Sequence, residues 1–178
     1  MKLTFWRLLP VIVFAFLVVF FWRGLSLDPQ KLPSVQVGQP LPEFKLPILK
    51  DQTKNLTPAN LRGKISLLNV WASWCSACIE EQVFLIQLAQ QGMPIYGLNY
   101  KDDSAKAAQW LVQWGNPYRL IGTDKTGKVA IDLGVYGAPE TFLIDKHGII
   151  RFRHVGVLDE KSWTQDFIPQ IESLQGQP

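Results

Sequence analysis

One stretch of sequence decides the fold: Ile65-Ser66-Leu67-Leu68-Asn69-Val70-Trp71-Ala72-Ser73-Trp74-Cys75-Ser76-Ala77-Cys78-Ile79-Glu80-Glu81. Its first half is an apolar run with the length and β-branched content of a buried strand, and its second half has the character of a helix start. Cys75 and Cys78 are the only two cysteines of the chain. Whatever chemistry they perform they perform together, and their spacing favours a redox-active dithiol.

The spacing also predicts different roles for the two cysteines. Side chains at positions i and i+3 of a helix lie on one face, close enough for a disulfide. Cys75 is expected at the first turn, where unpaired backbone N–H groups and the helix dipole favour its thiolate. We therefore expect Cys75 to attack a substrate disulfide and Cys78 to resolve the mixed disulfide. Trp74 should pack beside the pair and limit access to it.

Two other interpretations of the cysteine pair are weaker. Half of a zinc site would need further ligands, and His147 and His154 are seven residues apart rather than at the usual short spacing. A purely structural disulfide would close a very short loop, which removes little entropy from the unfolded chain. The sequence therefore predicts a redox dithiol without a metal or another cofactor.

The N-terminal segment is apolar enough to interact with a membrane. Residues 8–22 contain no polar side chain, with Lys2 and Arg7 before them and Arg23 after them. Counted from Leu3, the stretch reaches the ~20 residues that span a bilayer. A cleaved signal peptide has an apolar region of ~7–15 residues and an A-x-A-like site, which residues 23–28 lack. The sequence predicts an uncleaved transmembrane signal-anchor over residues 1–23, with the rest of the chain exported.

The positive charge of the chain comes from this segment. The chain has 18 lysines and arginines, 15 acidic residues and a formal net charge of +3. Three of the basic residues lie in the first 23 positions, where there is no acid, so the remainder has as many acidic as basic residues. A nucleic-acid-binding surface would need a basic excess, and that class of partner is therefore excluded from the prediction.

The order of the expected elements indicates a thioredoxin-like α/β fold, a mixed sheet flanked by helices. Prolines at five positions between 29 and 47 predict a linker over residues 24–43, which leads into a domain over residues 44–175. Strands are expected at residues 64–71, 94–99 and 118–121, a hairpin at 140–145 and 149–155, and helices at 76–91, 104–114, 129–133 and 159–174.

A proline supports the same fold. Pro139 stands immediately before an expected strand, in Gly134-Val135-Tyr136-Gly137-Ala138-Pro139-Glu140. It could simply begin that strand. In a thioredoxin-like fold this position faces the dithiol and holds a cis proline, which is affordable at an X-Pro bond. The backbone of Ala138 would then be able to pair with an extended segment of a substrate.

Two glutamates belong to the expected site. Glu81 follows Cys78 by three residues and so falls on the same helical face. It could merely complement the helix dipole, or it could disfavour a thiolate on Cys78 and shuttle its proton. Glu140, next to the proline, is either a surface residue of a strand or a charged rim for a substrate groove. Glu80 is assigned to solvent.

Four segments together resemble a known family. Val70-Trp71-Ala72-Ser73-Trp74-Cys75-Ser76-Ala77-Cys78, with Glu81 after it, is similar to the active site of membrane-anchored thioredoxin-like proteins. With three more segments, the chain resembles the cytochrome c biogenesis thiol–disulfide interchange proteins of the CcmG or DsbE type, up to about Trp163. These segments are Asn99-Tyr100-Lys101-Asp102-Asp103, Gly115-Asn116-Pro117-Tyr118 and Gly134-Val135-Tyr136-Gly137-Ala138-Pro139-Glu140-Thr141-Phe142-Leu143-Ile144-Asp145.

The resemblance implies a function and a location. It implies a periplasmic oxidoreductase held in a bacterial inner membrane, which keeps the haem-binding cysteines of apocytochrome c reduced, directly or through a thiol partner. A membrane electron donor of the DsbD type would recharge it, and its acidic site residues map onto Glu81 and Glu140. The family often has proline inside the C-x-x-C loop, where this chain has Ser76-Ala77, a pair that tunes the reduction potential. The alternatives are a general periplasmic thiol oxidant and a metal-delivery protein on the same fold.

Overall fold

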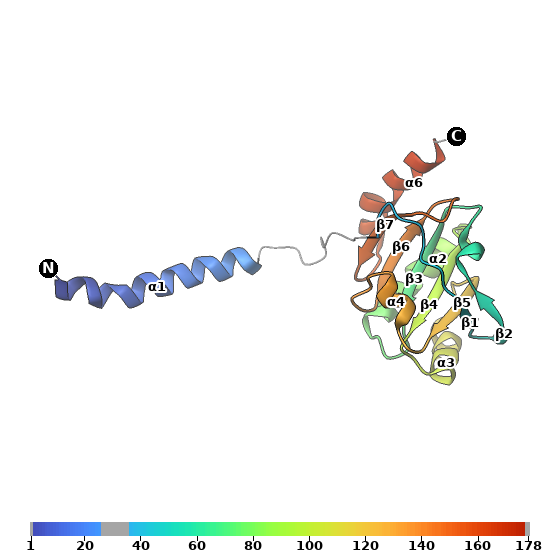
Figure 1. The fold of residues 1–178 in the computed structure, drawn as a ribbon, viewed down its shortest axis with the longest axis horizontal. Coiled ribbons are helices and arrows are strands. Elements are labelled where there is room, and N and C mark those ends of the chain that lie inside the picture. Colours follow the sequence, from blue (N-terminus) through green and yellow to red (C-terminus); the bar gives the residue numbers. More distant parts are fainter. Residues whose placement is uncertain (1, 26–35, 177–178) are drawn as a thin grey trace. The chain divides into compact units, whose positions relative to one another are not determined.

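The computed structural model describes the backbone of residues 2–25 and 36–176, and the side chains of residues 9–23 and 36–176. The chain divides into two units, Met1–Pro33 and Ser34–Pro178. The second unit holds the sheet (Figure 1). Its strands are β1 (Leu46–Ile48), β2 (Asp51–Leu56), β3 (Ser66–Trp71), β4 (Ile95–Tyr100), β5 (Leu120–Asp124), β6 (Glu140–Ile144) and β7 (Ile150–Val155). Its helices are the 3-10 helix η1 (Pro58–Leu61), α2 (Ala77–Gln90), α3 (Ser104–Trp114), α4 (Lys128–Asp132), α5 (Glu160–Ser162), the π-helix η2 (Trp163–Phe167) and α6 (Ile168–Gln175).

The strands form one mixed sheet in the order β2-β1-β5-β4-β3-β6-β7. β3 and β4 are parallel, as are β4 and β5, whereas β3 and β6 and the β6–β7 hairpin are antiparallel. All six residues of β3 are buried, as expected for a strand that is covered on both faces. The thioredoxin-like mixed sheet with flanking helices, predicted from the element order, is therefore confirmed.

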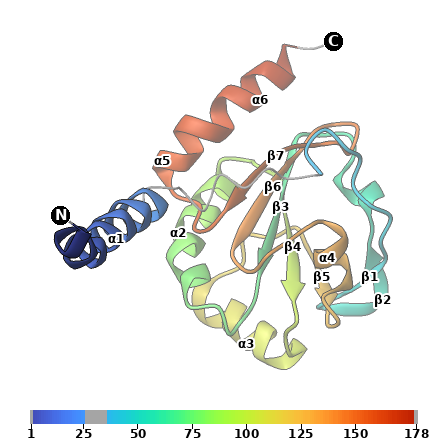
Figure 2. The ribbon, with the colours of Figure 1, turned by 60° about the vertical axis from the view of Figure 1, so that its left-hand side comes forward.

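The alternation of side chains along β3 separates two cores. Leu67 and Trp71 point to the face covered by α2, α3 and α6, while Leu68 and Val70 point to the face covered by η1 and α4. Figure 2 shows α2 and α4 on opposite sides of the sheet. Asn69 stands two residues after Leu67 and two before Trp71, so its side chain points to the same face of the sheet as theirs. The sequence therefore directs this buried amide toward α2, the helix that begins between the two cysteines.

Three elements differ from the sequence-based expectation. β2 was not expected, because its residues are mostly exposed and have no apolar alternation to reveal a strand. β5 runs to Asp124, beyond the predicted end at Ile121. The C-terminal helix is interrupted by the π-helical turn η2, where Trp163 stacks on Phe167 with 5.4 Å between ring centroids. Both rings join the core on the α2 face of the sheet.

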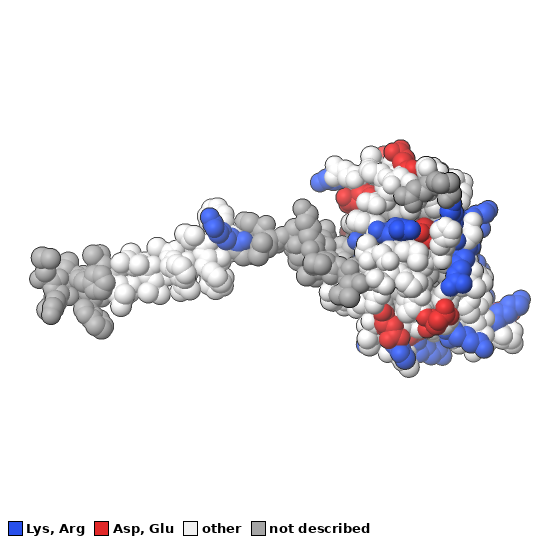
Figure 3. All heavy atoms as spheres, turned by 45° about the horizontal axis from the view of Figure 1, so that its top comes forward, with Lys and Arg blue, Asp and Glu red and all other residues white. Residues whose placement is uncertain are grey.

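The N-terminal unit contains helix α1 (Lys2–Leu25), whose described side chains are exposed. In Figure 3 this part of the helix has no acidic atoms, and its basic atoms gather at one end, where Arg23 lies. No helix among the described residues is long and apolar enough to cross a membrane.

The segment that precedes β1 is more ordered than a linker. Half of the predicted linker, residues 26–35, lies outside the described residues. Its last part is packed against the domain: Gly38 N–H donates to the Ile150 carbonyl at 2.8 Å, and Leu41 N–H donates to the Gly148 carbonyl at 2.9 Å. Leu41 and Phe44 are buried in the core on the α4 face. Residues 38–44 are therefore attached to the sheet and its core.

Candidate active site

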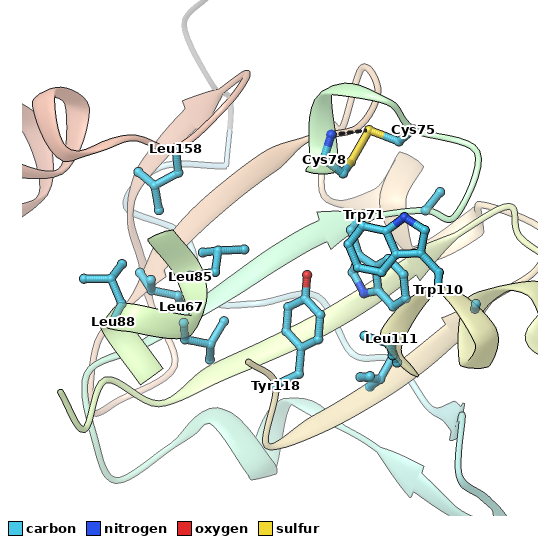
Figure 4. Packing of buried hydrophobic residues seen from close by; sticks show 14 of the residues in the cluster. Leu67, Trp71, Cys75, Cys78, Leu85, Leu88, Trp110, Leu111, Tyr118 and Leu158 are labelled. Carbon is cyan, nitrogen blue, oxygen red and sulfur yellow. Dashed lines mark hydrogen bonds between the residues drawn. A yellow bond between two sulfur atoms is a disulfide. The ribbon is translucent and has the colours of Figure 1, made fainter. Parts of the chain in front are cut away.

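The two cysteines lie at the N-terminus of α2 and form a disulfide, with 5.4 Å between their Cα atoms. Cys78 N–H, in the first turn, donates to Cys75 Sγ at 3.1 Å, as drawn in Figure 4. The backbone of the helix start thus contacts the sulfur that we expected it to favour as a thiolate. Cys75 is 5% exposed and Cys78 is 1% exposed, so Cys75 is the more accessible of the two.

The loop before Cys75 is tethered to the loop after β4 by Asp102. The Asp102 carboxylate accepts hydrogen bonds from the backbone N–H and the hydroxyl of Ser73, both at 2.6 Å, and from the Asn99 side-chain amide at 2.8 Å. Trp74 is 57% exposed, and its indole N–H donates to the Lys101 carbonyl at 3.1 Å. The indole beside the disulfide therefore has a fixed orientation while its ring remains accessible.

The Ala138–Pro139 peptide bond is cis, as the sequence predicted for this position. Pro139 is buried and Ala138 is half-buried. The Pro139 carbonyl accepts from Gly156 N–H at 2.9 Å, which ties the start of β6 to the residue after β7. In the thioredoxin-like fold this proline faces the dithiol, so the segment before β6 is the expected docking edge.

Glu140 is neither a surface residue of its strand nor part of an exposed rim, contrary to both expectations. It is 1% exposed, and its Oε2 lies 2.7 Å from Nη2 and 2.8 Å from Nε of Arg153 on β7. Its Oε1 accepts from the backbone N–H groups of Tyr136 and Gly137 at 2.7 and 3.2 Å. The Arg153 guanidinium also lies over the Tyr136 ring, 4.6 Å from its centroid. Glu140 therefore holds the chain that leads into the cis proline.

Glu81 is buried on the same face of α2 as Cys78, one turn further along. Its Oε1 accepts from the Asn69 side-chain amide at 2.8 Å, and its Oε2 accepts from Leu158 N–H at 2.9 Å. Desolvation raises the pKa of Glu81 from 4.5 to about 7, although both hydrogen bonds oppose the increase. A carboxyl group that titrates near neutral pH next to a thiol can exchange a proton with it.

Asn69 connects Glu81 to two further side chains. Its amide nitrogen also contacts Thr141 Oγ1 at 3.0 Å, and its Oδ1 accepts from the Tyr118 hydroxyl at 2.8 Å. Burial raises the pKa of Tyr118 well above 10, and the negative charge of Glu81 acts in the same direction. At neutral pH the tyrosine is therefore a neutral hydrogen-bond donor.

Sequence reasoning located most of these side chains but missed their partners. Asp102 and Tyr118 stood inside the segments that carried the family resemblance, and Asn69 stood in the stretch that decides the fold, yet nothing in the sequence assigned them a contact. Arg153 was missed altogether, and because Arg151 and His154 stand in the same strand, nothing in the sequence distinguished it as the buried charge. No three histidine, cysteine, aspartate or glutamate side chains gather into a possible metal site in the part of the chain that the structure describes.

Comparison with known proteins agrees with this geometry. The family model described as Redoxin matches residues 36–167. The chain is 50% identical over 171 residues to the thiol:disulfide interchange protein DsbE of Pseudomonas aeruginosa, covering 96% of this chain and 95% of that protein. It is 45% identical to the protein of the same name from Escherichia coli, covering 93% and 92% of the two chains.

A solved structure agrees as well. The thio-disulfide isomerase of Thermus thermophilus superposes with a TM-score of 0.62 at 25% identity, covering 76% of this chain and 97% of that one. A disulfide at a helix start and a cis proline before a strand are thus found in a chain whose relatives are named for thiol–disulfide interchange. The chain is a thiol-disulfide oxidoreductase that belongs to the Redoxin family, within the thioredoxin superfamily, and among its members to the DsbE proteins.

Proposed function

We propose that this protein is a membrane-anchored periplasmic reductant of cytochrome c maturation, which keeps the haem-binding cysteines of apocytochrome c reduced, directly or through a thiol partner. The observation that carries the proposal is the Cys75–Cys78 disulfide at the start of α2, with a buried carboxyl group one turn further along the helix. The direction of electron transfer comes from the family resemblance. A membrane donor of the DsbD type would return the disulfide to the dithiol.

The reaction transfers two electrons from the dithiol to a substrate disulfide. The Cys75 thiolate attacks one substrate sulfur, a mixed disulfide forms, and the other substrate sulfur leaves as a thiolate. Cys78 then loses its proton and attacks Cys75 Sγ. The second substrate thiolate leaves, and the Cys75–Cys78 disulfide remains. Both substrate thiolates take up protons from solvent when the solution is below their pKa.

Glu81 is the proposed acceptor of the Cys78 proton. It lies on the helical face of Cys78 and titrates near neutral pH, so it can accept a proton that the buried thiol must release. When the disulfide is reduced again, the same carboxyl group can return the proton. Among the site residues, Cys75, Cys78 and Glu81 are therefore the proposed catalytic groups.

Substrate is proposed to bind at the edge made by Trp74 and the cis-proline segment. Trp74 offers an exposed ring, and Ala138 offers a backbone next to Pro139 for pairing with an extended chain. Glu140 contributes indirectly, because its contacts to the Tyr136 and Gly137 backbone hold that segment.

The proposed location rests on the N-terminal sequence. Residues 8–22 are uninterrupted apolar and flanked by basic residues, and the described side chains of α1 from Leu9 to Trp22 are exposed. A segment of this kind favours an anchor with its basic N-terminus in the cytoplasm. Alkaline extraction of membranes and protease treatment of intact spheroplasts test the proposal. A protein released by alkali, or one protected from external protease, would contradict it.

Trapping of the mixed disulfide tests the proposed function. Cys78→Ser in the full chain, reduced and exposed to an oxidised peptide with a Cys-x-x-Cys-His sequence, should accumulate a covalent adduct through Cys75. Cys75→Ser is the matched control and should trap none. Isolation of the same adduct from cells, with the partner identified by mass spectrometry, should yield an apocytochrome c or a thiol partner of its maturation.

The reduction potential separates this proposal from the general oxidant. A reductant must hold its dithiol at a potential well below that of the strong oxidant DsbA, which is about −120 mV. Equilibration of the full chain with glutathione gives the value. A potential near about −120 mV would refute the reductive direction while leaving the dithiol chemistry in place.

A further inference from the structure

The amide of Asn69 has two possible orientations, and its neighbours do not all tolerate both. In the observed orientation its N–H groups face Glu81 and Thr141, and its Oδ1 accepts from Tyr118. Rotation by 180° would exchange the nitrogen and the oxygen. The Thr141 hydroxyl can donate or accept, so it fits either orientation.

Tyr118 fits only one orientation. Its side chain is buried, with 6% of the residue exposed, and among the described residues Asn69 Oδ1 is the single partner of its hydroxyl. Figure 4 shows its ring next to the indole of Trp71, with the hydroxyl pointing into the core. If the amide rotated, the hydroxyl could accept from the amide nitrogen, but its own hydrogen would lose its acceptor. A buried donor without an acceptor is costly.

The orientation of the amide matters to Glu81. Both carboxyl oxygens face donors, the Asn69 amide and Leu158 N–H, and donors favour the ionised form. A rotated amide would instead present Oδ1, which repels a carboxylate and accepts a hydrogen bond from a carboxylic acid. Protonation of Glu81 and rotation of Asn69 would therefore favour each other.

We propose that Tyr118 is a positioning residue of the dithiol site, whose hydroxyl fixes the Asn69 amide with its N–H groups toward Glu81. Tyr118 contacts neither the cysteines nor a substrate in this role. With the amide fixed, Asn69 Oδ1 cannot accept a hydrogen bond from the protonated carboxyl group of Glu81. The proton of Glu81 therefore stays available to Cys78. The effect of Tyr118 on catalysis rests on the proposed role of Glu81 in proton transfer. The effect of Tyr118 on the titration of the Glu81 carboxyl group does not depend on that role.

The titratable groups around Glu81 are few. Cys78 lies one turn before it on α2, and Tyr118 lies on the segment before β5. The neutral partners of the carboxyl group are Asn69 of β3 and Leu158 N–H, and Thr141 of β6 contacts Asn69. On β7, the His154 ring nitrogen lies 3.0 Å from the carbonyl of Val157, the residue before Leu158. Working with the disulfide form removes Cys78 from the titration. A histidine contribution would be equal in all variants below.

The experiment is a titration of the Glu81 carboxyl group in the oxidised full chain. The 13Cδ signal of Glu81, in detergent micelles, is assigned by its absence in Glu81→Gln. Tyr118→Phe should move the midpoint upward by about one pH unit, because the amide can then rotate and accept from the protonated carboxyl group. Tyr96→Phe is the matched control, since Tyr96 belongs to the core on the other face of the sheet, and should leave the midpoint unchanged. An unchanged or lower midpoint in a folded Tyr118→Phe protein would overturn the proposal.

Two further measurements keep the proposal testable. In the unmodified sequence, the Asn69 side-chain amide protons should keep their nuclear Overhauser contact to the Thr141 methyl group on both sides of the Glu81 titration. Loss of that contact at low pH would mean that the amide rotates with the hydroxyl present, and would overturn the proposal without any variant. The pH profile of single-turnover peptide reduction should move with the carboxyl midpoint. If only the carboxyl midpoint moves, Tyr118 positions Asn69 as proposed and the proton-transfer role of Glu81 is what fails.

Discussion

Replacement of Glu81 by glutamine should remove a pH dependence from the stability of the fold. The pKa of the buried carboxyl group is raised from 4.5 to about 7. Between these values the folded protein holds a proton that the unfolded chain has released. The resulting stabilisation is complete below about pH 4.5 and is lost as the pH rises through about 7. From about pH 5 to about pH 8.5 the loss amounts to about 2–3 kcal/mol.

Chemical denaturation of the oxidised full chain measures this loss. The free energy of unfolding is compared between wild type and Glu81→Gln at about pH 5 and about pH 8.5, with the disulfide intact so that neither thiol titrates. The variant has no proton to lose at this position. Its free energy of unfolding, relative to that of the wild type, should therefore rise by about 2–3 kcal/mol across the range. Only this change with pH is decisive, because a glutamine amide facing the Asn69 amide adds a cost that is the same at every pH.

Glu80→Gln is the control for Glu81→Gln. Glu80 lies one position earlier on α2 and is exposed, so the same loss of charge there should leave the pH dependence as in the wild type. The reasoning would be refuted if the difference between Glu81→Gln and wild type stayed constant across the range. In that case the carboxyl group would have the same proton affinity in the folded and unfolded chain, so burial would not raise the pKa of Glu81.

Two further predictions concern the scaffold of the site, and both are measured by chemical denaturation. Glu140→Gln leaves Arg153 buried without its counter-charge and should destabilise the domain by about 3 kcal/mol, whereas Glu43→Gln, which removes an exposed charge, should change stability by less than about 0.5 kcal/mol. A small effect of Glu140→Gln would mean that the pair is open to water. Gly97→Ala should destabilise by about 1–3 kcal/mol, because the added Cβ would lie 2.9 Å from Trp71 Nε1 and 3.1 Å from Tyr118 Cγ. An unchanged midpoint would show that the aromatic side chains can move apart.

The parts of the site that depend on local periodicity could be predicted from the sequence. The i, i+3 spacing places Cys75 beside Cys78, and the same spacing places Glu81 on the face of Cys78, where the structure has it buried. The turn residues around Lys146-His147-Gly148 likewise predicted the β6–β7 hairpin. In each case the interacting residues are within a few positions of one another, so secondary structure alone brings them together.

The contacts that depend on register could not be predicted in this way. Glu140 and Arg153 are thirteen residues apart on antiparallel strands, and a shift of one residue would put Arg153 on the other face of the sheet. Tyr118 and Asn69 are 49 residues apart. They meet only because the side chain of Tyr118, just before β5, reaches across the intervening strand β4 to β3. For that reason the sequence offered Glu140 as a surface residue, while the structure buries it against a cation.

The two buried glutamates show how their surroundings separate structural from chemical roles. Both are 1% exposed and each accepts hydrogen bonds on both oxygens. Glu140 has an arginine on one oxygen, so its negative charge is balanced inside the protein and it is suited to hold a loop in place. Glu81 has only neutral donors, which offset part of the cost of burying a charge but not all of it. A carboxyl group with this environment exchanges its proton near neutral pH. Its position one helical turn from Cys78 supports the proposal that this thiol gives its proton to Glu81.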